Sequence, residues 1–329
     1  MINLELKRLL EQFPLPKPWT TPELHSDILD LGNCVLITIG LVASTPGYPP
    51  VTASAVGIDE SPFLRAYFEL IERISICLIE RSEKQVFLKT SFNGQEDSIS
   101  RLEVFPQSPN PKLWVFSRSN GVSAQVNYDL ACRSSALELI ERDVVLRSWQ
   151  GETSAIQCQR TQKRFPQFLE ENYIMNDYFF NSQRTFLGKV FVCGTFGFPI
   201  RPELPFLCGF GASLELNSAI ERAYRESLQR LGFLWDDIPP ELVRPSPTPE
   251  FHLDYYWKTD NHLKIKKWLE HRVTDERAQN EQNSDDLYFI DITPTCSKAH
   301  FSVVKCISNS RLPLYFGSQL QGERIHPIA

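Results

Sequence analysis

The sequence of 329 residues contains no run of basic residues, no long apolar segment and no C-x-x-C pair among its eight cysteines. Its 40 acidic residues outnumber its 34 basic ones, and the net charge of -6 disfavours a nucleic-acid-binding surface. The longest apolar stretch, residues 34–42, is far shorter than the roughly 20 residues that a membrane helix requires. We therefore expect a soluble globular protein that binds neither nucleic acid nor membrane.

Two further absences exclude particular kinds of binding site. The six histidines and eight cysteines show no metal-ligand spacing, which disfavours a zinc site or a redox motif. No G-x-x-x-x-G-K-[ST] sequence is present, so any nucleotide would have to be bound without a P-loop. Charges continue through residues 1–8, where a secretory signal would become apolar, and the expected location is the cytoplasm.

The chain shows no composition break strong enough to separate independently folding domains. Residues 13–23 are too rich in proline for a helix, so residues 1–30 are interpreted as an N-terminal helix and a proline-rich lead-in. Residues 31–329 are expected to form one α+β domain, with loop insertions at about 236–250 and 278–286.

Apolar residues that recur at spacings of three and four predict three long helices, at about 61–80, 129–149 and from 217 onward. A shorter polar helix is expected at about 260–279. Buried strands are predicted where short apolar runs lie between turn residues. These runs are residues 34–43, 112–117, 189–194, 204–210, 287–292 and 301–307.

The three long helices carry a repeated acidic pattern. The sequence Glu-Leu-Ile-Glu-Arg occurs at 69–73 and again at 138–142, and the third helix contains Ile-Glu-Arg-Ala-Tyr-Arg-Glu at 220–226. Glutamates three residues apart differ by about 60° around a helix, so they share one side and repel each other. A cation close to each pair is therefore expected.

Two interpretations of this pattern remain open from the residues alone. Glutamate and arginine are good helix formers, and the motifs could be solvated faces of amphipathic helices. Alternatively, carboxylates embedded among aliphatic neighbours point into a polar cavity. Converging carboxylates suit Mg²⁺ on nucleotide phosphates, and arginines on the same faces suit the phosphates themselves.

The order of these motifs resembles the YcaO family. The family shows a glycine-containing lead-in to an E-x-x-E-R helix, then a strand, S-N-G and a second E-x-x-E-R helix, and finally A-x-x-R-A-x-x-E-x-x-Q. The resemblance covers about residues 30 to 325. The matching residues are Gly57, Glu69, Glu72, Arg73, Ser119, Asn120, Gly121, Glu138, Glu141, Arg142, Asp143, Ala219, Arg222, Ala223, Glu226 and Gln229.

The resemblance implies a single YcaO-like domain of mixed β-sheets in which three acidic helices converge on a nucleotide. YcaO proteins bind ATP and Mg²⁺ and phosphorylate a peptide backbone amide, which leads to azolines, thioamides or amidines. By resemblance, Glu69, Glu141 and Glu226 would hold the metal. The residues expected to contact ATP are Glu72, Ser119, Asn120, Glu138, Arg142, Arg222 and Gln229.

The sequence also departs from the family pattern. Leu130 stands where the family has a metal-binding glutamate before an alanine, and Gln125 replaces a glycine. This departure favours an alternative, a catalytically degenerate YcaO-fold protein that serves as a binding or scaffold subunit of a peptide-maturation complex. No catalytic side chain is assigned.

The resemblance also sets the expected partners. They are a ribosomally made peptide, as in bacteriocin maturation, and a leader-peptide-binding or other maturation protein. A homodimer is compatible with the sequence.

Overall fold

The three predicted long helices are present in the computed structural model, which describes residues 2–82, 86–158, 165–234, 246–257, 259–272, 286–318 and 325–328. They are α2 (Phe63–Arg81), α4 (Tyr128–Trp149) and α6 (Leu216–Leu234). The shorter helices are α1 (Ile2–Gln12), α3 (Arg101–Val104), α5 (Gln167–Asn172), α7 (Pro249–Trp257), α8 (Thr259–Glu270) and the 3₁₀ turn η2 (Thr295–Ser297).

An antiparallel sheet near the N-terminus consists of β1 (Glu23–Asp30), β2 (Val35–Ala43) and β3 (Val51–Ile58) in that order. β2 is the strand predicted at 34–43. The sequence did not predict β1, because this edge strand is mostly polar and exposed and so lacks an apolar alternation. Its pairing with β2 runs from Glu23 opposite Val42 to Asp30 opposite Val35. The expected division at residue 30 stays a prediction, and these hydrogen bonds cross it.

A second antiparallel sheet has the order β11-β10-β9-β8 and comprises β8 (Ile156–Cys158), β9 (Tyr173–Thr185), β10 (Gly188–Pro199) and β11 (Leu207–Ser213). Helix α6 lies directly against β11. A Cβ on Gly209 would stand 2.2 Å from the Ser227 backbone nitrogen, and one on Gly211 would stand 2.4 Å from the Ala219 carbonyl oxygen. Only glycine permits this approach, which brings the acidic motif of α6 to the strand.

A third sheet has the order β5-β4-β12-β13-β7 and comprises β4 (Val86–Ser91), β5 (Glu96–Ser100), β7 (Val122–Gln125), β12 (Leu287–Asp291) and β13 (Ser302–Ser308). Helices α2 and α4 cover opposite faces of it. Val303 packs in the core that contains the apolar side of α2, whereas Val304 packs with α4. A separate ribbon pairs β6 (Trp114–Phe116) with β14 (Tyr315–Gly317).

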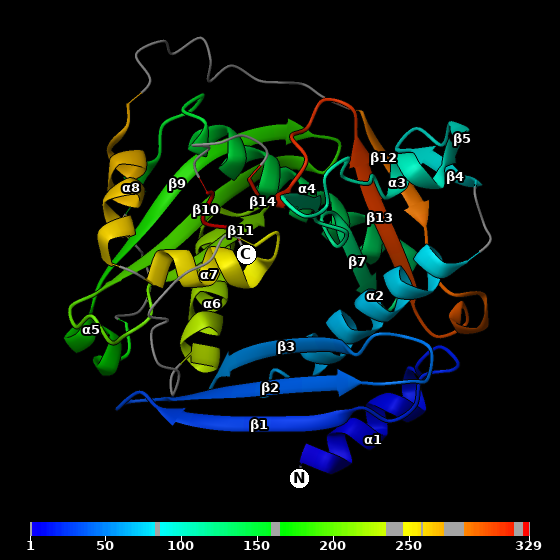
Figure 1. The fold of residues 1–329 in the computed structure, drawn as a ribbon, viewed down its shortest axis with the longest axis horizontal. Coiled ribbons are helices and arrows are strands. Elements are labelled where there is room, and N and C mark those ends of the chain that lie inside the picture. The colour runs from blue at the N-terminus through cyan, green and yellow to red at the C-terminus, as the bar shows by residue number, and fades with distance from the viewer. Residues whose placement is uncertain are drawn as a thin grey trace.

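The N-terminal sheet lies beneath α2 and α6, and the other two large sheets flank the long helices above it (Figure 1). Mixed helices and antiparallel sheets confirm the α+β class. Most of the loops expected at 236–250 and 278–286 lies outside the described residues; helix α7 begins at Pro249, within the first of these ranges, and Asp286 at the end of the second is described. In the described part of the chain, every helix is too short or too polar to span a bilayer.

Candidate functional site

A cavity of about 560 Å³ brings the acidic motifs of α2, α4 and α6 together. Three of the ten predicted site residues, Asn120, Glu141 and Arg222, are not part of its wall. Its wall contains both polar and apolar residues. The predicted residues that line it are Glu69, Glu72, Ser119, Glu138, Arg142, Glu226 and Gln229.

The α2 carboxylates are held from the strands on either side. Glu69 Oε2 accepts a hydrogen bond from the Ser54 backbone N–H at 3.1 Å, and Oε1 lies 2.5 Å from Arg73 Nη2. Glu72 accepts a hydrogen bond from the Ala124 backbone. Burial raises the pKa of both groups, and the charges of Glu138 and Glu69 raise the pKa of Glu72 further. These carboxylates therefore lack full compensation by positive charge.

The α4 carboxylates also lack full compensation by positive charge. Burial raises the pKa of Glu138 to about 7, against the opposing effects of Arg142 and a backbone hydrogen bond from Gly121. Glu141 is only 8% exposed, and burial together with the charges of Glu226 and Glu138 raises its pKa to about 8. A cation entering this region would favour the ionised forms of both groups.

Arg142 lies between the carboxylates of α4 and α6. Its Nη2 is 3.6 Å from Glu226 Oε1, and its Nε is 3.7 Å from Glu141 Oε1. The Nε and Nη1 atoms are buried and donate no hydrogen bond to any residue that the structure describes. Glu226 Oε2 accepts a hydrogen bond from the Phe210 backbone at 3.0 Å. A guanidinium with spare buried donors can still bind an anion such as phosphate.

The Ser-Asn-Gly turn brings Ser119 to the cavity and leaves Asn120 buried behind it. Gly121 has φ +69°, and a Cβ there would stand 2.7 Å from the Cys306 carbonyl oxygen, so the turn requires glycine. Leu130 lies elsewhere, on the first turn of α4, where it is 43% exposed and does not line the cavity. Gln125 Nε2 lies 3.5 Å from Ser134 Oγ.

Several residues of the cavity wall were not predicted from the sequence. Thr52 and Ser54 come from β3, and the Ser54 carbonyl and hydroxyl oxygens each accept a hydrogen bond from Gln229 Nε2 at 3.2 Å. Thr52 and Ser54 alternate with the apolar residues Val51, Ala53 and Ala55, and this alternation could have predicted a strand with both polar side chains on one face. The apolar part of the wall comes from distant segments without a shared motif. It comprises Cys208, Phe210, Phe233, Leu314, Phe316 and Pro327, and Arg230 lies beside it.

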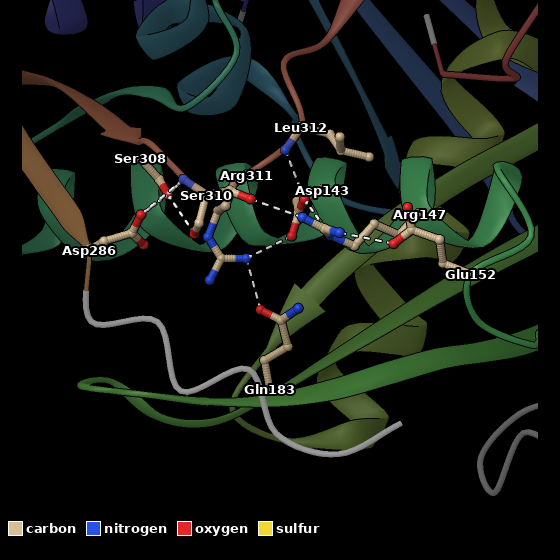
Figure 2. A network of polar contacts seen from close by, with 9 residues as sticks. All are labelled: Asp143, Arg147, Glu152, Gln183, Asp286, Ser308, Ser310, Arg311 and Leu312. Carbon is tan, nitrogen blue, oxygen red and sulfur yellow. Dashed lines mark hydrogen bonds and ion pairs between the residues drawn. The ribbon is translucent and has the colours of Figure 1, made fainter. Parts of the chain in front are cut away.

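A buried polar network fixes α4 through Asp143 (Figure 2). Asp143, which follows Arg142, accepts hydrogen bonds from Arg311 Nη1, Arg147 Nε and the Leu312 backbone at 3.0, 3.0 and 2.9 Å. Arg311 Nη1 also donates to Gln183 at 2.8 Å. Leu314, which lines the cavity, follows this anchored segment. The network therefore connects α4 with the segment that brings Leu314 to the cavity wall.

With this geometry established, comparison with known proteins gives a family. A model described as YcaO cyclodehydratase, binding ATP and Mg²⁺, matches residues 98–309, well over half of the chain. The chain therefore belongs to the YcaO family, a family of ATP- and Mg²⁺-dependent peptide cyclodehydratases. The resemblance read from the motifs is confirmed, as are the cofactors ATP and Mg²⁺. No curated protein matches the sequence as a relative.

Solved structures share the fold at low sequence identity. YcaO from Methanopyrus kandleri, bound with AMPPCP and Mg²⁺, is 18% identical with a TM-score of 0.61, over 94% of this chain and 90% of that one. A heterocyclase in complex with substrate and cofactor is 15% identical with a TM-score of 0.63, over 93% of this chain and 52% of that one. A chain of the Escherichia coli microcin synthetase McbBCD complex is 11% identical with a TM-score of 0.56, over 88% of this chain and 87% of that one.

The donor set fits ATP with Mg²⁺ rather than a bare metal ion. Within the described ranges, no three His, Cys, Asp or Glu side chains are grouped so as to hold a metal by themselves. Magnesium usually takes one or two carboxylates and completes its octahedron with water and substrate phosphates. Carboxylates whose charge is undercompensated, next to an arginine with unused donors, match that mode of binding.

The raised pKa of Glu141 predicts a pH effect on stability without ligand. Its pKa is about 8 in the folded protein and about 4.5 in a free chain, so between these values the folded state retains a proton that the unfolded state has lost. The resulting stability is fully present below about pH 4.5 and is lost as pH rises through about 8. Glutamine mimics the protonated carboxyl.

The free energy of unfolding of Glu141→Gln, relative to wild type, should therefore increase by about 1 kcal/mol or more between pH 5 and pH 8.5. Urea denaturation of both proteins at the two pH values measures this difference. The Glu221→Gln variant, which alters a residue outside the cavity wall, is the control. A difference that is constant with pH would show that Glu141 is ionised in the folded protein throughout.

Proposed function

We propose that this protein uses ATP and Mg²⁺ to activate a backbone amide of a ribosomally made peptide during its maturation. The single observation that carries the proposal is that carboxylates from three helices line one cavity together with Arg142. Phosphoryl transfer depends chiefly on positioning and neutralisation of charge, which such a cavity can provide. Membership of the YcaO family supports the same activity.

The proposed roles follow the motifs of the YcaO family, and seven of the ten residues concerned line the cavity. Glu69, Glu141 and Glu226 would contribute carboxylates to Mg²⁺, with Glu72 and Glu138 beside them. Bound Mg²⁺ would neutralise the phosphate charge that develops during transfer.

The phosphate contacts would come from the arginines and the polar residues of the wall. Arg142 would bind phosphate through its unused donors, and Arg222 would contribute from outside the wall. Ser119 and Gln229 face the nucleotide space, and Asn120 supports the turn behind Ser119.

The substrate is proposed to be a peptide in which a side chain or another nucleophile attacks the activated amide. The amide oxygen takes the γ-phosphoryl group of ATP and ADP leaves. A neighbouring Cys, Ser or Thr then adds to the amide carbon and loses its side-chain proton. Phosphate departs with the former amide oxygen, and the nitrogen loses its proton to give the C=N bond of an azoline. Other nucleophiles would give thioamides or amidines.

A partner protein is proposed to deliver the peptide. Two similar structures are described as a heterocyclase with substrate and as the McbBCD complex with pro-MccB17 bound, which is compatible with a peptide and partner subunits here. A homodimer and a cytoplasmic location are further parts of the proposal.

Phosphate release tests this function. Wild type incubated with ATP and MgCl₂ should release phosphate, and omission of Mg²⁺ or the Glu141→Ala substitution should reduce release at least about tenfold. A colorimetric phosphate assay on proteins with matched circular dichroism spectra measures this. Equal release by wild type and Glu141→Ala would exclude the assigned site as the source of turnover.

One observation favours the degenerate alternative. Leu130 is exposed and apolar where the family pattern has a metal-binding glutamate, so a binding or scaffold subunit remains the second candidate. If this position is the defect, Leu130→Glu should make phosphate release appear or rise. Leu102→Glu is the matched control, because Leu102 is 57% exposed on α3, outside the cavity wall. No change in the Leu130 variant would contradict a defect at this position.

A further inference from the structure

A buried lysine interrupts the apolar face of a central strand. Lys305 lies on β13, is only 5% exposed, and is aligned with Ile290 of β12 and Val122 of β7, which both pack in the α2 core. Burial of an ammonium group is costly, and burial lowers the pKa of Lys305 to about 8. A methionine would fill similar space without that cost, so the charge at this position needs a reason.

The ammonium group holds the Ser-Asn-Gly turn from behind. Lys305 Nζ donates hydrogen bonds to the carbonyl oxygens of Asn120 at 2.8 Å and Arg118 at 3.2 Å. The Phe105 ring covers it, with Nζ 5.3 Å from the ring centre. The Cys306 backbone N–H adds a hydrogen bond to the Gly121 carbonyl at 2.7 Å. β13 therefore holds the backbone carbonyl groups of Arg118, Asn120 and Gly121.

The same segment presents its amides to the acidic helices. The Gly121 backbone donates to Glu138 on α4, and the Ala124 backbone donates to Glu72 on α2. Lys305 also interacts electrostatically with both glutamates. The segment thus lies between a buried positive charge on one side and two cavity carboxylates on the other, and Ser119 enters the cavity from its start.

We propose that Lys305 is a positioning residue of the nucleotide site. It anchors the 118–121 turn so that Ser119, the Gly121 amide and the Ala124 amide hold their places, and it puts a positive charge behind Glu72 and Glu138. The inference rests on the proposed function, because it assigns Lys305 to the Mg²⁺-ATP site. It adds a residue from the C-terminal sheet that the acidic motifs do not contain.

Calorimetric titration of Mg²⁺-ATP into full-length variants tests this role. Lys305→Met should weaken binding about tenfold or more, because it removes two charge-assisted hydrogen bonds and the charge behind two carboxylates. Lys305→Arg, which keeps charge and donors, should bind within about threefold of wild type, whereas Lys305→Gln should not. Lys298→Met is the control, because Lys298 is 56% exposed and pairs with Asp291 on the surface.

The outcomes separate this role from a purely structural one. If Lys305→Met melts at a lower temperature but its folded form binds Mg²⁺-ATP like wild type, the positioning role is wrong. If Lys305→Met does not fold, the Arg and Gln variants decide, since equal affinities in both would overturn the need for charge. If wild type itself fails to bind Mg²⁺-ATP, the proposed function fails instead, and hydrogen exchange at the Gly121 amide then tests the anchoring alone, with unchanged exchange in Lys305→Gln contradicting it.

Discussion

Replacement of Glu226 by glutamine should weaken the binding of Mg²⁺-ATP by about 100-fold or more. One oxygen of Glu226 accepts a hydrogen bond from the Phe210 backbone, and the other faces Arg142 at 3.6 Å. Glutamine keeps a carbonyl oxygen for the backbone but brings no charge to Mg²⁺ and none to Arg142. Isothermal titration calorimetry with ATP in excess MgCl₂ measures the loss.

Glu221→Gln is the matched control for this variant. Glu221 lies on the same helix, five residues earlier, and does not line the cavity. Its substitution should leave the affinity within about twofold of wild type, since it changes no group of the cavity wall. Equal losses in the two variants would mean that the effect comes from the charge of α6 as a whole rather than from a ligand position.

Replacement of Asp143 by alanine should lower the free energy of unfolding by about 3–5 kcal/mol. Asp143 is 1% exposed and Arg311 8%, so the substitution leaves the guanidinium buried and deprived of its carboxylate. It also removes the acceptor for Arg147 and for the Leu312 backbone (Figure 2). Chemical denaturation followed by tryptophan fluorescence measures the loss.

The control for Asp143→Ala is a surface ion pair. Asp97 lies 3.5 Å from Lys89 and is 66% exposed, so Asp97→Ala should cost at most about 1 kcal/mol. The double variant Asp143→Leu with Arg311→Met should recover part of the loss, because it removes both charges of this buried pair together. A loss below about 1 kcal/mol for Asp143→Ala would contradict a buried, fully engaged network.

The sequence predicted the parts of the site that rest on local pattern. Glu69 and Glu72 on α2, and Glu138 and Arg142 on α4, follow from helical spacing, and they do line one cavity. The strands at 34–43 and 301–307 were also correct, because short apolar runs between turns require burial. The motif order added what spacing could not, namely that the three helices face one another.

Residues whose position depends on tertiary packing could not be predicted in this way. Lys305 carries a charge within an apolar strand, but only the paired strands show that it reaches the 118–121 turn. Conversely, Glu141 matches the motif and yet is buried outside the cavity wall, beside Arg142. The edge strand β1 has no apolar alternation, so only its pairing with β2 reveals it.

Titration of ATP into the wild-type protein in the presence of Mg²⁺, repeated with Glu141→Ala, tests the central claim most directly. Glu141 carries a pKa raised to about 8 by burial and neighbouring carboxylates, which bound Mg²⁺ would compensate. The account predicts measurable heat and a single site for wild type, and no detectable binding for Glu141→Ala. Undetectable nucleotide binding by wild type would contradict the claim that these acidic helices form an ATP site.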